Sequence, residues 1–226
     1  MVKVDRFSRN KQTITDEQQT LLGQKKILVI GCGGLGTHVL EGLARIGIKQ
    51  IGLCDYDVFD VSNLNRQLGA LEVTIGKSKA LMAHDRIKSI NEAAEVTMYQ
   101  DKYPNERLLN DLSEYDLVID CLDSIVTRKQ LEQDCLALEK TLIHGAIAGH
   151  YGYFGVITKD NPLIAIQENQ DNSIEKQLGN PYYIVATVAS MQLMLAIRVL
   201  LDQPYHQNGF YVIDLFDLSI DKIDLN

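Results

Sequence analysis

The chain has 226 residues, a formal net charge of −8 and 46% hydrophobic residues. This length and apolar content suit a single α/β domain with a buried core. The negative charge argues against a nucleic-acid-binding protein, because phosphate contacts need a basic face. The N-terminal 25 residues are mainly polar and charged, so we expect no secretory signal peptide.

Apolar strands alternate with helices through the first two thirds of the chain. In chain order, we expect a helix at 16–22, a strand at 26–30, a helix at 35–46, a strand at 50–54, a helix at 78–90, a strand at 95–99, a helix at 105–112, a strand at 117–121, a helix at 125–139 and a strand at 141–147. This alternation predicts a parallel sheet with right-handed crossovers, and therefore a Rossmann-like, doubly wound α/β fold.

The pattern changes after Gly149. There we expect a strand at 151–158, a polar loop at 159–180 that orders only on binding, an apolar helix at 182–201 and two strands at 210–216 and 219–225. These strands are predicted to extend the sheet edge in antiparallel fashion. We therefore expect one domain with an N-terminal arm and helix (1–25), a Rossmann-like part (26–148) and a C-terminal part of strands, loop and apolar helix (149–226).

The apolar helix expected at 182–201 is about long enough to span a bilayer. However, it contains Gln192 and Arg198, and Thr187 and Ser190 lie close to one helical stripe with Gln192. This composition favours a helix buried against the sheet or in a subunit interface, so we expect no membrane association.

A glycine-rich turn follows the first apolar strand. Its glycines are Gly31, Gly33, Gly34 and Gly36. Glycines permit a tight turn and let the chain approach a phosphate at the helix N-terminus, where free N–H groups and the dipole favour an anion. Cys32, inside this turn, is interpreted as a small residue where bulk would clash rather than as a nucleophile. Any dinucleotide-binding fold would account for these glycines.

Two aspartates follow the next strand. Asp55 and Asp57 lie about 20 residues beyond the glycines, where a nucleotide-binding fold places an acid on the ribose hydroxyls. The alternatives for Asp55 are a solvated loop acid or a helix cap. For Asp57, a turn acid that bonds its own backbone serves equally well.

Three cations follow within one loop and helix start. The planar guanidinium group of Arg66 is suited to bind phosphate oxygens. The alternative is that Arg66 makes a surface salt bridge. Lys79, and with less weight Lys77, lies at a helix start where the dipole disfavours a cation unless an anionic ligand binds. Asn63 could donate its amide to the same phosphates or close a turn. Three cations suit a triphosphate that loses pyrophosphate better than they suit NAD, so the segment predicts ATP.

Two further acids, Asp120 and Asp123, lie at the carboxyl end of the strand at 117–121, where open α/β sheets bind their ligands. A carboxylate there can hold Mg²⁺, which bridges the phosphate oxygens of ATP. Asp123 is also placed to cap the following helix, and one side chain cannot easily do both.

Five motifs occur in order, namely Gly-Cys-Gly-Gly-Leu-Gly at 31–36, Cys-Asp-Tyr-Asp at 54–57, Ser-Asn-Leu-Asn-Arg-Gln at 62–67, Gly-Lys-Ser-Lys-Ala at 76–80 and Val-Ile-Asp-Cys-Leu-Asp at 118–123. Together they resemble the ThiF/MoeB/HesA adenylyltransferases, relatives of the ubiquitin-activating enzymes. The resemblance implies that Asp55 holds the ribose of ATP, that Lys79 is the essential lysine and that Asp123 holds Mg²⁺. It also implies a homodimer in which Arg9 reaches the ATP site of the partner. Otherwise Arg9 is a charged residue of a tail.

The sequence departs from the family pattern at its cysteines. Many members hold a structural zinc with two Cys-x-x-Cys pairs, whereas the four cysteines here form no such pair, so we expect no zinc. Some members carry a cysteine before the apolar helix that forms a thioester or acyl disulfide with the carrier, and the matching stretch 173–180 has none. We interpret the four cysteines as reduced, as in a cytoplasmic protein.

The predicted reaction is attack of a carboxylate on the α-phosphate of ATP, which gives an acyl-adenylate and pyrophosphate and needs no side-chain nucleophile. The resemblance implies that this carboxylate is the C-terminal Gly-Gly of a small ubiquitin-like sulfur-carrier protein, as in molybdopterin or thiamine biosynthesis. Three alternatives stay open. They are adenylation of a small-molecule or tRNA-linked carboxylate, a non-catalytic partner subunit, and an NAD-dependent oxidoreductase.

Overall fold

The computed structural model describes residues 6–163 and 177–225. The strands are β1 (Lys26–Ile30), β2 (Gln50–Cys54), β3 (Glu95–Tyr99), β4 (Leu117–Asp120), β5 (Leu142–Ala148), β6 (Tyr151–Ile157), β7 (Gly209–Asp214) and β8 (Ser219–Asp224). The α-helices are α1 (Asp16–Leu22), α2 (Gly34–Ile46), α3 (Lys79–Ile90), α4 (Glu106–Asp111), α5 (Ile125–Ala137) and α8 (Tyr182–Leu200). These bounds differ from the expected ones by at most two residues. Of the polar loop expected at 159–180, residues 164–176 lie outside the described part.

All these strands belong to one sheet with the order β3-β2-β1-β4-β5-β6-β7-β8. β1 to β5 are parallel, and Ile27 of β1, for example, lies between Ile51 of β2 and Leu117 of β4. The pairs β5–β6, β6–β7 and β7–β8 are antiparallel. The predicted doubly wound α/β fold, with a mostly parallel sheet and antiparallel C-terminal strands, is confirmed.

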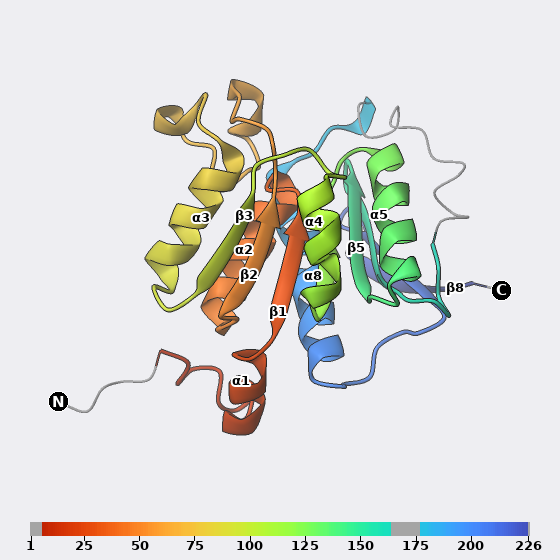
Figure 1. Ribbon diagram of the computed structural model, residues 1–226. Coiled ribbons are helices and arrows are strands. Elements are labelled where there is room, and N and C mark those ends of the chain that lie inside the picture. The colour runs from red at the N-terminus through yellow and green to blue at the C-terminus, as the bar shows by residue number, and fades with distance from the viewer. Residues whose placement is uncertain (1–5, 164–176, 226) are drawn as a thin grey trace.

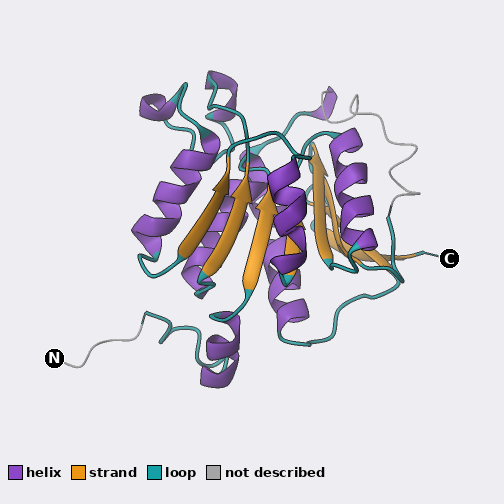
Figure 2. Ribbon diagram, viewed as in Figure 1, coloured by secondary structure: helices purple, strands orange, loops and turns teal. Residues whose placement is uncertain are grey.

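Helices cover both faces of the parallel part of the sheet (Figures 1 and 2). On one face, α2, α3 and α8 enclose a core that includes Val29 and Leu195. On the other, α4 and α5 enclose a second core that includes Leu28 and Leu131. Successive strand residues point to opposite faces, so a strand buried on both sides needs an unbroken apolar run. This is why the strand at Lys26–Ile30 shows no alternation in its sequence.

Helix α8 is long and apolar enough to span a bilayer by length and composition, and about half of that apolar window is buried. It packs on α2, β5 and β6. The approach to α2 is close, because a Cβ atom added to Gly42 would lie 2.4 Å from Cδ2 of Leu193. Gln192 is fully buried, and its Nε2 donates to the carbonyl oxygen of Asp120 at 2.7 Å. These contacts support the interpretation of α8 as a helix packed against the sheet.

The strand order reverses between β1 and β4. The chain leaves β1 towards β2 and β3 on one side and then returns to place β4 on the other side. The turns that follow β1 and β4 therefore diverge, which leaves a crevice at the carboxyl ends of these two strands. Helices α2 and α5 begin at this crevice, and the predicted site residues follow the same strand ends.

Candidate active site

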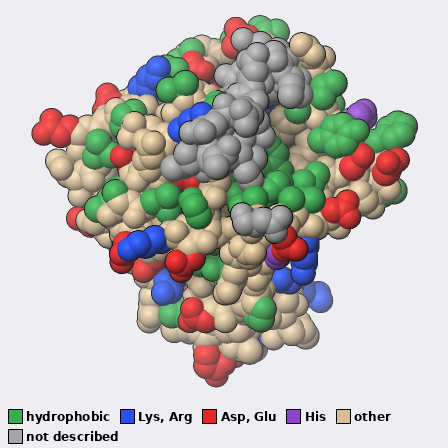
Figure 3. All heavy atoms as spheres, turned by 90° about the vertical axis from the view of Figure 1, so that its right-hand side faces the viewer, with side chains coloured by type: hydrophobic (Ala, Val, Ile, Leu, Met, Phe, Trp, Pro, Cys, Tyr) green, Lys and Arg blue, Asp and Glu red, His purple; other side chains and the backbone are tan. Residues whose placement is uncertain are grey.

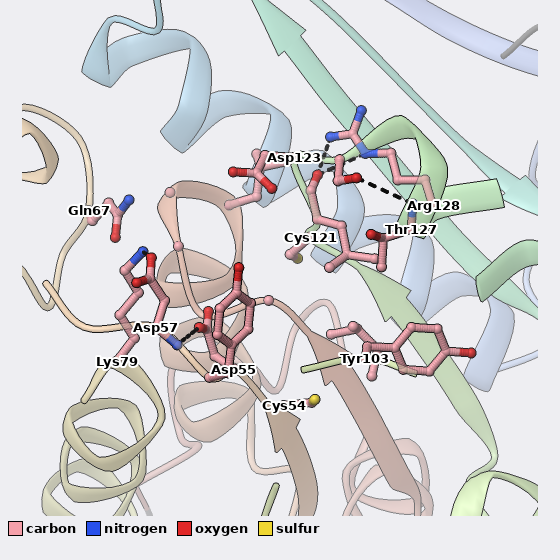
Figure 4. A pocket seen from close by; sticks show the side chains of 18 of the residues that line it. Cys54, Asp55, Asp57, Gln67, Lys79, Tyr103, Cys121, Asp123, Thr127 and Arg128 are labelled. Carbon is pink, nitrogen blue, oxygen red and sulfur yellow. Dashed lines mark hydrogen bonds and ion pairs between the residues drawn. The ribbon is translucent and has the colours of Figure 1, made fainter. Parts of the chain in front are cut away.

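A pocket occupies this crevice (Figure 4). Its lining consists of Ile30, Gly31, Gly33, Gly34, Leu35, Cys54, Asp55, Tyr56, Asp57, Arg66, Gln67, Lys79, Asp101, Lys102, Tyr103, Cys121, Leu122, Asp123, Ser124, Thr127, Arg128, Ile147, Asn180 and Val185. Most of the predicted site residues are thus brought together. Gly36, Asn63 and Arg9 do not line the pocket.

The glycines of the turn have two roles, which are to close the turn and to line the pocket. Gly31 has a φ of 98°, and a Cβ atom on it would lie 2.5 Å from the carbonyl oxygen of Cys121, while one on Gly36 would lie 1.8 Å from that of Gly31. These two glycines therefore close the turn against β4. Gly31 also lines the pocket, together with Gly33 and Gly34, and the N-cap Gly33 offers α2 no side-chain cap. The first N–H groups of α2 are consequently left for a ligand, as an anion site requires.

Asp55 binds the glycine turn. Its Oδ2 accepts the Cys32 N–H at 2.7 Å and its Oδ1 accepts the Asp57 N–H at 2.8 Å. The carboxylate thereby fixes the turn to the end of β2. Each carboxylate oxygen has a second lone-pair direction, so Asp55 can still accept from ribose hydroxyls in the pocket that it lines.

Lys79 points into the pocket from the first turn of α3, with its side chain 9% exposed. Its Nζ lies 2.6 Å from Oδ2 of Asp57, and Figure 4 shows the two charged groups facing each other. Partial burial acts to raise the pKa of Asp57, but hydrogen bonds from Lys79 and from the Val58 N–H outweigh it and lower that pKa. Lys77 is exposed and does not line the pocket.

Arg66 lines the pocket, whereas Asn63 does not. Nη1 of Arg66 donates to the carbonyl oxygen of Ser62 at 3.0 Å and to Oδ1 of Asn65 at 2.8 Å. Its Nε and Nη2 make no hydrogen bond within residues 6–163 and 177–225, so they are available to a ligand. The buried Asn63 accepts the Asp60 N–H through Oδ1 at 3.1 Å, in a capping box around a short 3₁₀ turn. The structural alternative for Asn63, a turn, is therefore the one observed.

Asp120 and Asp123, at the turn between β4 and α5, have different surroundings and therefore different roles. The N-cap of α5 is Ser124, whose Oγ accepts the Thr127 N–H at 3.4 Å. Asp123 therefore does not cap the helix. Asp120 is 1% exposed and is held by His144, with Nδ1 of His144 2.6 Å from its Oδ2.

Asp123 fits a Mg²⁺ site that the substrate completes. Its carboxylate is exposed, makes no hydrogen bond or ion pair within the described residues, and faces the same open space as Gln67 and Lys79 (Figure 4). Mg²⁺ at phosphate-binding sites needs only one or two carboxylates besides phosphate oxygens and water. The described residues contain no group of three or more His, Cys, Asp or Glu side chains that could hold a metal by themselves.

The N-terminal arm, which contains Arg9, lies at the opposite end of the sheet from the pocket (Figure 1). The arm is held there because Nη1 of Arg6 donates to Oδ1 of Asn91 at 2.8 Å and the ring of Phe7 packs on Gly47. Five strand residues span about 17 Å, which separates Arg9 from the pocket of its own chain. A role for Arg9 at such a pocket therefore requires a second copy of the chain.

All four cysteines are free and buried. Burial raises the pKa of the Cys54 and Cys135 thiols to about 12. It also raises the pKa of the Cys32 and Cys121 thiols well above the usual value. Because the thiolate is the reactive form, none of these groups is suited to accept an acyl group.

Several lining residues were not anticipated from the sequence. Tyr103 follows β3, and the rule that parallel strands present their carboxyl ends to one edge would have found it. Gln67, next to Arg66, is 7% exposed, and its buried Oε1 has no hydrogen-bond partner in the part of the chain that the structure describes. Thr127 and Arg128 reach the pocket from α5, one turn beyond Asp123. Their helical spacing was the available signal.

Comparison with known proteins identifies the family of this chain and agrees with its fold. The model of the ThiF family matches residues 7–226. The molybdopterin-synthase adenylyltransferase of Escherichia coli (strain K12) is 30% identical over 189 residues, which cover 80% of this chain and 75% of that protein. The adenylyltransferase and sulfurtransferase MOCS3 of Dictyostelium discoideum is 29% identical over 214 residues, which cover 88% of this chain and 48% of that protein. The chain spans about half or less of the MOCS3 relatives that it matches.

Among solved structures, E. coli MccB in a crystal with AMPCPP and selenomethionine MccA superposes with a TM-score of 0.81. The match covers 99% of this chain and 72% of that one at 20% identity, which establishes likeness of fold alone. With the family model matching almost the whole sequence, the chain belongs to the ThiF family.

Proposed function

We propose that this protein is an ATP-dependent adenylyltransferase. A substrate carboxylate attacks the α-phosphate of ATP, the bond between the α- and β-phosphates breaks, and the products are an acyl-adenylate and pyrophosphate. The observation that carries the proposal is the set of charged groups around the uncapped N-terminus of α2, where Lys79, Arg66 and Asp123 line one pocket. Family membership and the names of the relatives, which are adenylyltransferases, support it.

Each side chain has a distinct task in this reaction. The N–H groups of α2 and the dipole of that helix hold phosphate oxygens near Gly33 and Gly34. Asp55 accepts from the ribose hydroxyls. Lys79 and Arg66 stabilise the negative charge that develops on pyrophosphate as it leaves. Asp123 holds Mg²⁺, which when bound offsets charge on the phosphates.

The substrate carboxylate that we propose is the C-terminal Gly-Gly of a small ubiquitin-like sulfur-carrier protein. The relatives named for molybdopterin synthase and for sulfurtransferase activity support this choice. So does an exposed apolar surface on the side of the molecule seen in Figure 3, near the C-terminal strands. Its members include Tyr151, Tyr183, Phe216, Leu218 and Ile220, which are 44–83% exposed. Exposed apolar surface of this kind is typical of a protein-binding face.

A second candidate substrate is a small-molecule or tRNA-linked carboxylate, or a peptide. We retain this second candidate because the fold resembles that of MccB, which was crystallised with AMPCPP and MccA. Asn180 lines the pocket beside Val185, so the segment before α8 can shape a closed acceptor site. Competition between small acids and a carrier protein for the ATP-bound enzyme would separate the two candidates.

A non-catalytic partner subunit and an NAD-dependent oxidoreductase fit the pocket less well. A subunit that only binds has no use for Lys79, Arg66 and Asp123 together in one pocket. An NAD site holds its pyrophosphate mainly with backbone N–H groups and needs few cations. One titration with ATP and NAD would discriminate between these classes.

We further propose that the enzyme is a cytoplasmic homodimer in which Arg9 completes the partner's pocket. The N-terminal arm that carries Arg9 lies at the far end of its own sheet, which supports this arrangement, since only a second copy can bring Arg9 to a pocket. The Arg9→Ala variant should then lose exchange activity, and mixing it with an inactive Lys79→Met chain should restore part of that activity through hybrid dimers.

The test of the proposed function is ATP–pyrophosphate exchange. Purified protein should incorporate labelled pyrophosphate into ATP only when it is given a carboxylate substrate, and the first to try is a Gly-Gly-ended protein of under about 100 residues, a size at which small domains already fold. Exchange that requires this carrier supports the proposal. Absence of exchange with every carrier and small acid tried, from protein that binds ATP, would count against it.

A further inference from the structure

A buried polar cluster, consisting of Asp120, Arg128, His144 and Gln192, lies beneath the turn between β4 and α5. Its residues are at most 7% exposed, and Asp120 and His144 do not line the pocket. On the basis of the function proposed above, we propose that His144 is a positioning residue. Acting through Asp120, it holds the turn that presents Asp123 and thereby sets how tightly the pocket binds ATP with Mg²⁺.

Side chains of the cluster form hydrogen bonds with the backbone immediately before Asp123. Oδ1 of Asp120 accepts the Leu122 N–H at 2.9 Å. Nε of Arg128 donates to the carbonyl oxygen of Leu122 at 2.8 Å. The carbonyl oxygen of Asp120 accepts from Gln192 of α8. The N–H and the carbonyl oxygen of Leu122 are thus both held by hydrogen bonds from the cluster. The side chain of Asp123 itself has no partner in the described residues.

His144 supplies the hydrogen bond that keeps Asp120 in this position. Its Nδ1 lies 2.6 Å from Oδ2 of Asp120, and an ionised carboxylate only accepts, so His144 donates. A second donor near that oxygen is Arg128, whose Nε is 3.8 Å away and already bonded to Leu122. Without His144, Oδ2 would be a buried oxygen with no donor. The carboxylate would then turn towards Arg128, and Leu122 would lose one or both of its contacts.

Groups that hydrogen-bond to a metal ligand set its orientation, and their loss typically costs 10–100-fold in metal affinity. His144 acts on Asp123 through Asp120 and Leu122, so we expect the lower end of that range. The ring of His144 also faces Tyr153, with ring centroids 5.2 Å apart. That contact contributes packing, so a test must separate the loss of packing from the loss of the donor.

The test uses three variants of the full chain. His144→Leu keeps a similar volume and removes the donor. His144→Asn keeps an amide N–H close to the place of Nδ1. Ile143→Ala is the matched control, because Ile143 is the fully buried neighbour on β5 but belongs to the core under α2 and α8. Calorimetric titration with ATP, over a series of Mg²⁺ concentrations and in EDTA, gives the readout without any turnover.

We expect His144→Leu to raise the Mg²⁺ concentration needed for half-maximal tightening of ATP binding about tenfold, with ATP affinity in EDTA unchanged. His144→Asn should stay within about twofold of the parent chain. Ile143→Ala should melt earlier but keep the same Mg²⁺ requirement. If His144→Leu does not fold, His144→Ala, which also lacks the donor, takes its place.

Two results would overturn the inference alone. One is a folded donor-less variant with the parent's Mg²⁺ requirement, and the other is an equal shift in Ile143→Ala. A parent chain that binds ATP with no dependence on Mg²⁺ would instead overturn the proposed function, and this inference with it.

Discussion

The replacement of Lys79 by methionine separates the function of this residue from its contribution to folding. Lys79 has a buried stem, an ammonium group 2.6 Å from Oδ2 of Asp57, and a place in the first turn of α3. Methionine keeps an unbranched apolar stem of similar length and removes the charge. Lys77, two residues earlier, is exposed and outside the pocket, so Lys77→Met is the matched control.

The effect of Lys79→Met on stability should be small, because two terms oppose each other. The lost ion pair has a half-exposed partner, so it contributes about 0–1 kcal/mol. Removal of a cation from a helix N-terminus returns about 0.3–1 kcal/mol. The net change in the free energy of unfolding should stay within about 1 kcal/mol, or roughly 2–4 °C in melting temperature for a domain of this size.

The effect on the proposed reaction should be large. In the pocket, Lys79 is one of two cations that we assign to the charge on departing pyrophosphate. Loss of one donor of this kind typically lowers kcat by about 10²–10³, or roughly 2.7–4 kcal/mol. ATP–pyrophosphate exchange should therefore fall by about that factor in Lys79→Met, and Lys77→Met should retain the parent rate.

The reasoning about Lys79 would be refuted by a folded Lys79→Met chain with an exchange rate within a few-fold of the parent. It would also be refuted by an equal loss in Lys77→Met, because the effect would then come from overall charge and not from the pocket. A large loss of melting temperature in Lys79→Met would show that its ion pair with Asp57 serves the fold.

Four further predictions test other parts of the account. The Lys79 hydrogen bond lowers the pKa of Asp57 despite partial burial, so stability from this pair is present above the unfolded carboxyl pKa of about 3.9 and is lost as pH falls through the lower folded value. The melting temperature of the parent should therefore fall relative to that of Lys79→Met at the acid end, because only the unfavourable cation at the helix N-terminus is left there. Gly36→Ala should fail to fold, because its Cβ atom would lie 1.8 Å from a backbone oxygen, whereas Gly33→Ala, whose nearest atom is 3.7 Å away, should fold and bind ATP more weakly by calorimetry. Asp123→Asn should raise the Mg²⁺ requirement of exchange at least tenfold, because one oxygen ligand loses its charge. Native protein should resist iodoacetamide at pH 8, since all four thiols are buried with raised pKa values, and rapid labelling seen by mass spectrometry would contradict this.

The fold was predictable because the central parallel strands β1, β2, β4 and β5 are largely buried. Each of these four is a short, mainly apolar run, and the run itself sets the ends, as at Lys26–Ile30. The edge strand β3 is more polar and less buried. The antiparallel C-terminal strands could be inferred because no helix separates β7 from β8. The helix ends were less certain, since a helix can begin one residue earlier or later depending on its cap. For instance, Ser78 caps α3, so that helix begins at Lys79.

The site was predictable where a residue's backbone position determines its surroundings. Asp55 and Asp123 follow strands whose carboxyl ends meet at one edge, so both had to lie near the pocket. The choice between neighbouring polar residues was not predictable. Ser124 rather than Asp123 caps α5, and Asn63 turns into a capping box with Asp60, because such choices depend on local turns that several sequences can form.

The most direct measurement of the central claim is a crystal structure with a non-hydrolysable ATP analogue and Mg²⁺. The account predicts the triphosphate at the N-terminus of α2, with Lys79 released from Asp57 and within hydrogen-bonding distance of phosphate oxygens, Arg66 beside it and Mg²⁺ on Asp123. A nucleotide bound elsewhere, or phosphates beyond the reach of both Lys79 and Arg66, would contradict it.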